Sequence, residues 1–288
     1  MIDLTWLALR AVSLIVTFQA AGTALFVAAF APALAHHQHE LQRLGGRAAL
    51  ASLALLAAQA LFEPLHLAGD WSGVGSATVR VFMSSSAALA LCAALGGMAL
   101  LTLTLRRRRA LGRSGRTLAA IGSVVTLASF LLTGHTVAHR ERAPLAALLF
   151  AHLAIVAFWF GSLEPLRRLI ARAPPADAAR VTEAFSAAAV WLVPLIALLG
   201  AGMAWLLLPD AAALLRPYGL LLLSKAALFA LLLGLAALNR WRLVPALARA
   251  DTKAASRLGR SIGLEYLLIC VVFVVTAVMS GALSPQGD

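Results

Sequence analysis

The 288-residue sequence is 61% hydrophobic and only 12% charged, with a mean hydropathy of +0.89. A soluble domain carries about 25% charged residues, so this composition indicates an integral membrane protein. The apolar runs are continuous rather than alternating, which predicts an all-α, polytopic membrane bundle rather than a β-barrel. The formal net charge of +12 does not indicate nucleic-acid binding, because most arginines lie in short loops between apolar runs, where they set the membrane orientation.

Eight segments are long and apolar enough to cross a membrane, which takes about 20 residues in a helix. In chain order, the eight transmembrane helices are expected at 4–34, 47–68, 77–105, 117–134, 144–166, 183–208, 217–239 and 260–283. The first run has no basic stretch or cleavage site ahead of it and is expected to be a retained helix. Because the connections are short, residues 1–288 are expected to form a single transmembrane domain.

The basic residues predict how these helices are oriented. The loops after the first, third, fifth and seventh segments hold eighteen of the 24 Lys and Arg residues: Arg43, Arg47, Arg106, Arg107, Arg108, Arg109, Arg113, Arg116, Arg167, Arg168, Arg172, Arg180, Arg240, Arg242, Arg249, Lys253, Arg257 and Arg260. Loops rich in Lys and Arg remain in the cytoplasm. Both chain termini are therefore expected on the periplasmic side.

Four histidines lie at or inside the ends of apolar segments, on the side opposite the arginine-rich loops: His66, His135, His139 and His152. An imidazole near hydrocarbon is costly, and imidazole is also the commonest protein metal ligand. Several histidines at one depth therefore predict a shared metal site at the outer face.

Each of these histidines also has a simpler interpretation. His135 and His139 are four residues apart and share a face if the helix continues through them; if the chain turns at Gly134, they are loop residues, and a hydrated loop with two histidines is the alternative. His152 has apolar neighbours on both sides, and a lone membrane histidine can simply hydrogen-bond a neighbouring helix.

Further ligands are expected around the histidines. Glu63 precedes His66 by three residues, so its carboxylate can ligate the metal or orient the imidazole; the alternative is an ion pair at the membrane interface. Sulfur favours Cu(I), although methionine is also ordinary core filler. The candidate accessory ligands with sulfur are Met83, Met203, Met279 and Cys92.

A second histidine tract, formed by His36, His37 and His39, lies in the first arginine-bearing loop. Such a tract can hold a metal and is predicted to be a release site on the cytoplasmic side; the alternative is a solvated polar loop. The sequence has no phosphate-binding loop, nucleophile elbow or Cys-x-x-Cys motif. We therefore predict that the protein is not an enzyme.

Two stretches carry a resemblance to a known family. The fifth segment has the order His152, Trp159, Gly161, Pro165, and the sixth and seventh segments have Phe185–Ser186, Tyr218–Gly219, Lys225, Asn239–Arg240 and Pro245. This pattern, strongest over 145–250, resembles the CopD (PcoD) copper-resistance membrane proteins. The resemblance implies a bacterial inner-membrane protein that moves copper from periplasm to cytoplasm, often beside the periplasmic copper-binding protein CopC.

The resemblance supports His152 directly, whereas His66, His135 and His139 are assigned by depth and side alone. The function predicted is copper transport through a periplasm-side histidine site, with a copper ion bound there in either oxidation state. One alternative is a membrane b-type cytochrome in which His152 and either His66 or His135 ligate haem from facing helices. Another is a copper-binding assembly or sensor protein that does not transport.

Overall fold

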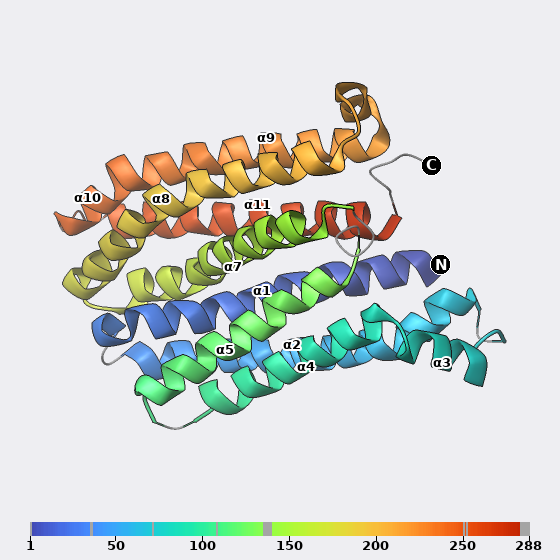
Figure 1. Ribbon diagram of the computed structural model, residues 1–288. Coiled ribbons are helices and arrows are strands. Elements are labelled where there is room, and N and C mark those ends of the chain that lie inside the picture. Colours follow the sequence, from blue (N-terminus) through green and yellow to red (C-terminus); the bar gives the residue numbers. More distant parts are fainter. Residues whose placement is uncertain are drawn as a thin grey trace.

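The computed structural model describes residues 2–34, 37–70, 72–107, 109–134, 140–249, 251 and 253–282. Within these ranges the chain is helical and has no strand, which confirms the predicted all-α class. Eight helices in this part of the chain are long and apolar enough to cross a membrane, as predicted. They pack side by side along a common direction (Figure 1).

The elements follow one another with short connections. In chain order they are α1 (Ile2–Leu34), α2 (Gln38–Ala68), α3 (Ser76–Met83), α4 (Ser86–Leu105), α5 (Arg113–Ser129), the 3-10 turn η2 (Phe130–Leu132), α7 (Arg142–Arg172), α8 (Pro175–Leu207), the 3-10 helix η3 (Ala211–Leu215), α9 (Pro217–Leu238), the π-helical turn η4 (Asn239–Leu243), α10 (Val244–Ala248) and α11 (Ala254–Ala282). Both described chain ends lie at the same end of the bundle, which we call the outer end (Figure 1). The arginine-rich connections lie at the opposite, inner end.

The third predicted segment, 77–105, is two helices rather than one. The hydroxyls of Ser84 and Ser85 donate to the carbonyl oxygens of Val81 and Phe82, and the Ser85 Oγ also accepts from the N–H of Ala88 at 3.3 Å. Serine side chains compete in this way with helical hydrogen bonds and cap the next helix. The membrane span is therefore α4 alone, and α3 is a short helix at the outer end.

Several helices extend beyond their predicted inner ends. α2 begins at Gln38 instead of near residue 47, and its Leu41 is buried. Glu40 of this extension forms an ion pair with Arg172 at the inner end of α7. Charged residues there do not stop the helices, because outside the hydrocarbon they are solvated while neighbouring apolar residues remain packed.

α1 is the central helix of the bundle. It packs against α2, α5, α7 and α11, and it lies between α7 and α2 (Figure 1). Its closest approach to α7 is at Gly22 and Gly161: a Cβ on Gly22 would lie 1.7 Å from the carbonyl oxygen of Ala157, and a Cβ on Gly161 would lie 2.4 Å from the Cα of Gly22. Small residues allow such backbone contact between membrane helices.

Polar side chains strengthen the same crossing. The Thr23 hydroxyl and the Gln19 side-chain amide donate to the carbonyl oxygen of Gly161 at 3.0 and 3.3 Å. Both side chains are buried, and in hydrocarbon such groups need internal partners. The glycine contact and these hydrogen bonds together fix α1 against α7.

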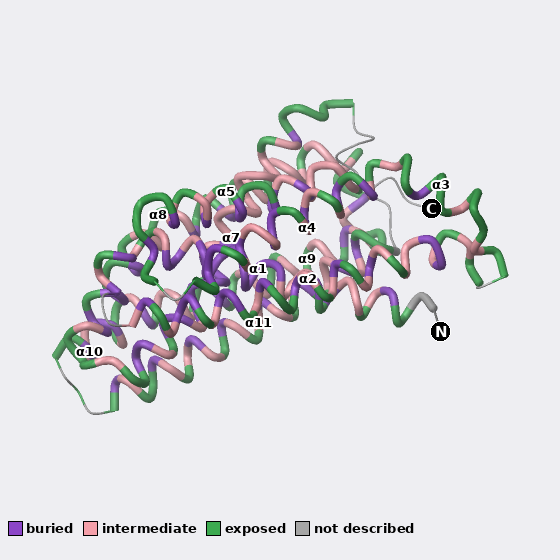
Figure 2. Tube along the Cα trace, turned by 90° about the horizontal axis from the view of Figure 1, so that it is seen from below, coloured by how far each residue is buried: buried purple, intermediate pink, exposed green. Residues whose placement is uncertain are grey.

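The helices α8 and α9 lie at the edge of the bundle (Figure 1), and few of their residues are buried. Figure 2 colours the whole chain by burial. Their exposed side chains are apolar and large, including Trp191, Leu198, Trp205 and Leu231. An apolar outer surface on helices of this length is the surface that contacts lipid. The lipid bilayer is thus the protein's surroundings, as predicted.

The outer connection between α2 and α3 holds a hydrogen-bonded aspartate, Asp70. Gly69 follows the last residue of α2, and its φ of 82° is in the left-handed region that glycine favours. Hydrogen bonds from the Ser72 hydroxyl at 2.6 Å and the Gly73 N–H at 2.9 Å hold the pKa of the Asp70 carboxyl below its ordinary value. These bonds tie Asp70 to Ser72 and Gly73 beyond the end of α2.

Candidate functional site

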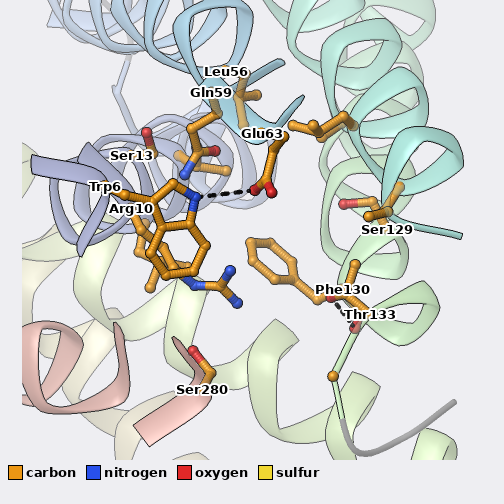
Figure 3. Close-up of a pocket in the computed structure, with 17 residues that line it drawn as sticks. Trp6, Arg10, Ser13, Leu56, Gln59, Glu63, Ser129, Phe130, Thr133 and Ser280 are labelled. Carbon is orange, nitrogen blue, oxygen red and sulfur yellow. Dashed lines mark hydrogen bonds between the residues drawn. The ribbon is translucent and has the colours of Figure 1, made fainter. Parts of the chain in front are cut away.

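A cavity of about 260 Å³ lies at the outer end of the bundle, between α1, α2, α4, α5 and α11 (Figure 3). Much of its lining is polar, although it lies between membrane helices. The polar and charged residues that line it are Arg10, Ser13, Thr17, Gln59, Glu63, Ser129, Thr133 and Ser280. Polar groups at such a depth in a membrane bundle mark a site for water, an ion or a substrate.

Trp6 and Arg10 of α1 hold the carboxylate of Glu63 on α2. The Trp6 Nε1 donates to Glu63 Oε1 at 3.4 Å, and the Arg10 guanidinium lies 5.0 Å from the centroid of the Trp6 ring, in cation–π contact. Arg10 also interacts electrostatically with Glu63. All three side chains meet at the cavity (Figure 3), so the negative charge of Glu63 is partly balanced by the Arg10 guanidinium.

His66 lies one helical turn beyond Glu63 and packs against the same tryptophan. Its ring is stacked on Trp6, with centroids 4.3 Å apart and planes inclined by 8°. Glu63 and His66 therefore both contact Trp6. This agrees with the prediction from their spacing that they lie on one face of the helix. Trp6 itself was missed by the sequence analysis; the signal was an indole four residues before an arginine in an otherwise apolar helix.

The predicted ligands His135 and His139 lie outside the described residues. The chain enters that segment from Gly134, which lines the outer cavity and has a φ of 69°. His135 is therefore the next residue in the sequence after a residue of the cavity wall, and His139 is four residues further on. Of the inner tract, His36 also lies outside the described residues, His37 is half-buried, and His39 is exposed at the start of α2.

His152 lies in a different part of the bundle. It is half-buried on α7, with its Nδ1 3.3 Å from the carbonyl oxygen of Ile196 on α8, and it interacts electrostatically with Lys225 on α9. Since α1 lies between α7 and α2 (Figure 1), His152 and His66 are not brought together. This separation disfavours a haem held between these two residues.

The accessory candidates are dispersed. Met83 is 62% exposed at the end of α3, Cys92 is exposed on α4, and Met203 is half-buried on α8. Met279 is buried on α11, next in sequence to the cavity residue Ser280. Among the described residues, no three His, Cys, Asp or Glu side chains are grouped closely enough to hold a metal ion. The Glu63–His66 pair would need ligands from elsewhere.

Buried polar side chains continue inward from the cavity along α1. The Thr17 and Ser52 hydroxyls are 2.7 Å apart, joining α1 to α2. The Ser13 hydroxyl and the Gln19 side-chain oxygen are buried and have no hydrogen-bond partner among the described residues. Such groups are costly in hydrocarbon, so a water molecule or a ligand at these two atoms would supply the missing partner.

A second polar cluster lies toward the inner end, where α7, α8, α9 and α11 meet. A small cavity of about 50 Å³ is lined there by Trp159, Ser186, Asn239, Arg240 and the buried Glu265. Four of these five residues belong to the pattern that carries the family resemblance. The exception, Glu265, lies on α11, far from the other four residues in the sequence.

Comparison with known proteins agrees with the resemblance. Residues 179–279 match the family model CopD, described as copper resistance protein D, and this segment runs from α8 to α11. Among curated proteins and among solved structures, no match was found. The match confirms the predicted resemblance over the part of the chain that holds Lys225, Asn239 and Glu265. Over residues 179–279, the chain is therefore similar to the CopD family of copper-resistance membrane proteins.

Proposed function

We propose that this protein carries copper across the bacterial inner membrane from periplasm to cytoplasm, and that copper enters through the outer cavity. The observation that carries the proposal is the convergence of Glu63 and His66 on Trp6 at the cavity wall. The match to the family described as copper resistance protein D supports copper as the metal, and the eight helices long enough to span a membrane support a membrane passage.

Capture begins at the Glu63 carboxylate. Imidazole nitrogen and carboxylate oxygen are both copper ligands, and His66 lies one turn from Glu63. The remaining ligands are proposed to come from His135 and His139, since their segment starts at the cavity wall. Copper arriving at Glu63 replaces the electrostatic contact with Arg10, whose guanidinium stays on the Trp6 ring.

From the cavity, copper would move inward past the buried hydroxyls of Ser13, Thr17 and Ser52 and leave near His36, His37 and His39. A membrane potential that is negative inside favours this direction by about 2.3 kcal/mol per charge per 100 mV. We assign His152 to helix contact rather than to the first capture step, because Lys225 would oppose a cation there. A separate periplasmic protein of the CopC kind is the proposed copper donor.

The proposed direction is tested by copper accumulation in cells. Cells that produce the chain are expected to contain more copper than cells without it at the same external copper concentration. The Glu63→Gln variant, produced at the same level, is expected to remove most of this excess, whereas Glu183→Gln, on the exposed inner part of α8, should not. Lower copper in the producing cells would indicate export and overturn the proposal.

The orientation on which the proposal depends has its own test. In a chain whose Cys92 and Cys270 are replaced by alanine, single cysteines are placed at two exposed alanines, Ala77 in α3 and Ala110 between α4 and α5. A membrane-impermeant maleimide added to intact spheroplasts is expected to label Ala77→Cys and to leave Ala110→Cys unlabelled until the membrane is opened. The reverse pattern would place the cavity on the cytoplasmic side.

A further inference from the structure

Glu265 is a carboxyl group buried inside a membrane helix. It lies on α11 and is only 3% exposed. The ion pairs found among the described residues join Glu164, Glu40 and Asp177 to arginines and do not include Glu265. A carboxyl group in hydrocarbon without a cation partner is an expensive arrangement and marks a functional position.

Neutral groups surround this carboxyl. The Asn239 side-chain amide donates to Glu265 Oε1 at 2.5 Å, and the Trp159 indole donates a further hydrogen bond. Asn239 is itself only 8% exposed, and its side-chain oxygen is buried without a hydrogen-bond partner. The Asn239 side-chain oxygen is therefore a hydrogen-bond acceptor without a donor. The neighbouring Glu265 carboxyl group cannot supply a donor when it is ionised, because a carboxylate only accepts hydrogen bonds.

The charged neighbours do not replace that missing partner. Arg240 lines the same small cavity, but its guanidinium donates to the Ser186 hydroxyl at 3.3 Å. On α7, Glu164 is paired with Arg167 and Arg168 and lines a separate groove at the inner end, together with Tyr266 of α11. Arg240 is thus the only other charged residue among those lining the Glu265 cavity.

A proton would complete the arrangement. With Glu265 protonated, its O–H can donate to the unused oxygen of Asn239 while the Asn239 amide donates back, so that acid and amide satisfy each other in a two-bond pair. The adjoining cavity of about 50 Å³ is large enough for a water molecule that delivers the proton.

The backbone at Asn239 is also unusual. α9 ends there in a π-helical turn, in which the Val244 N–H bonds to the carbonyl oxygen of Asn239. Pro245, which follows, has no N–H to continue the regular helix. Single π turns occur frequently at functional sites. This one begins at Asn239, the residue that donates to Glu265, and lies at the inner end of α9.

From this geometry we propose that Glu265 is a proton-binding site, and that it binds and releases one proton in each copper-transport cycle. The coupling rests on the proposed transport function, whereas the proton site itself does not. The proton comes from water at the inner end and forms the O–H bond of the Glu265 carboxyl, which then donates to Asn239. On release it returns to water and leaves the carboxylate with the Asn239 and Trp159 donors.

Infrared spectroscopy of the purified protein in lipid tests the proton site without copper. At neutral pH, a carbonyl stretch of a protonated carboxyl group is expected, and it should disappear in Glu265→Gln but persist in Glu183→Gln. A spectrum without such a band in the wild-type protein, or a band unaffected by Glu265→Gln, overturns the inference even if every variant folds.

Vesicles that contain a trapped pH indicator test the coupling. Wild-type protein is expected to move protons as copper enters, and Glu265→Gln is expected to move copper with at least tenfold fewer protons per ion. Copper entry with the same proton movement in both proteins overturns the coupling alone. Vesicles in which wild-type protein admits no copper overturn the transport proposal, and the coupling with it, while the infrared result still decides the proton site.

Discussion

Replacing Gly22 with leucine is expected to prevent α1 and α7 from packing. Even the first carbon of a side chain at this position would lie 1.7 Å from the carbonyl oxygen of Ala157 and 2.8 Å from the Cα of Gly161. Both neighbours are backbone, so neither can swing aside. Overpacking usually costs about 1–3 kcal/mol, and we expect this substitution to cost at least about 3 kcal/mol because two central helices must separate.

The measurement is the yield and thermal unfolding temperature of protein purified in detergent. Gly96→Leu on α4 and Gly234→Leu on α9 are matched controls, because a Cβ at either glycine has no neighbour within 4 Å. Both controls should be close to wild type, and Gly22→Ala should fall between them and Gly22→Leu. A Gly22→Leu protein as stable as the controls would contradict the close crossing of α1 and α7.

Loss of Glu63 or His66 is expected to weaken copper binding strongly. Removing a residue that ligates or orients a metal typically lowers the affinity roughly 10- to 100-fold, and both residues converge on Trp6 at the cavity. Copper affinity is measured on purified protein by competition with a chelator. Glu63→Gln and His66→Ala should each show this loss, and Glu183→Gln should bind as wild type.

Two further variants distinguish how the site is held. Trp6→Phe keeps an aromatic ring for His66 to stack on but removes the indole N–H that binds Glu63, so an intermediate loss is expected. His152→Ala should change the affinity less than His66→Ala. His152 lies beside the carbonyl oxygen of Ile196 and interacts electrostatically with Lys225, both on helices away from the outer cavity. If His152→Ala abolishes binding while His66→Ala does not, the entry site lies between α7, α8 and α9 instead.

The sequence predicted the membrane spans because they depend on local composition. Runs of apolar residues and their flanking arginines identify the eight helices without any knowledge of packing. The break between α3 and α4 was missed, since the run from 77 to 105 is apolar on average. The interruption depends on hydrogen bonds of Ser84 and Ser85 to particular backbone atoms, which hydropathy does not represent.

The sites were predicted less completely because they depend on which helices meet. Glu63 and His66 are three residues apart, so their pairing is local and visible in the sequence. The sequence places His66 and His152 at a similar depth in the membrane. A shared depth does not reveal that α1 lies between the two helices that carry them (Figure 1). Trp159, Asn239 and Glu265 come from three helices, and only the packing of α7 and α9 against α11 gathers them around one cavity.

Copper flux into sealed vesicles containing only the purified protein tests the central claim most directly. Wild-type protein, with a potential negative inside, is expected to admit copper well above protein-free vesicles, and Glu63→Gln should reduce the initial rate about tenfold or more. Glu183→Gln should match wild type. Equal flux through wild-type and Glu63→Gln protein would contradict entry through the outer cavity, and flux no greater than in protein-free vesicles would contradict copper transport itself.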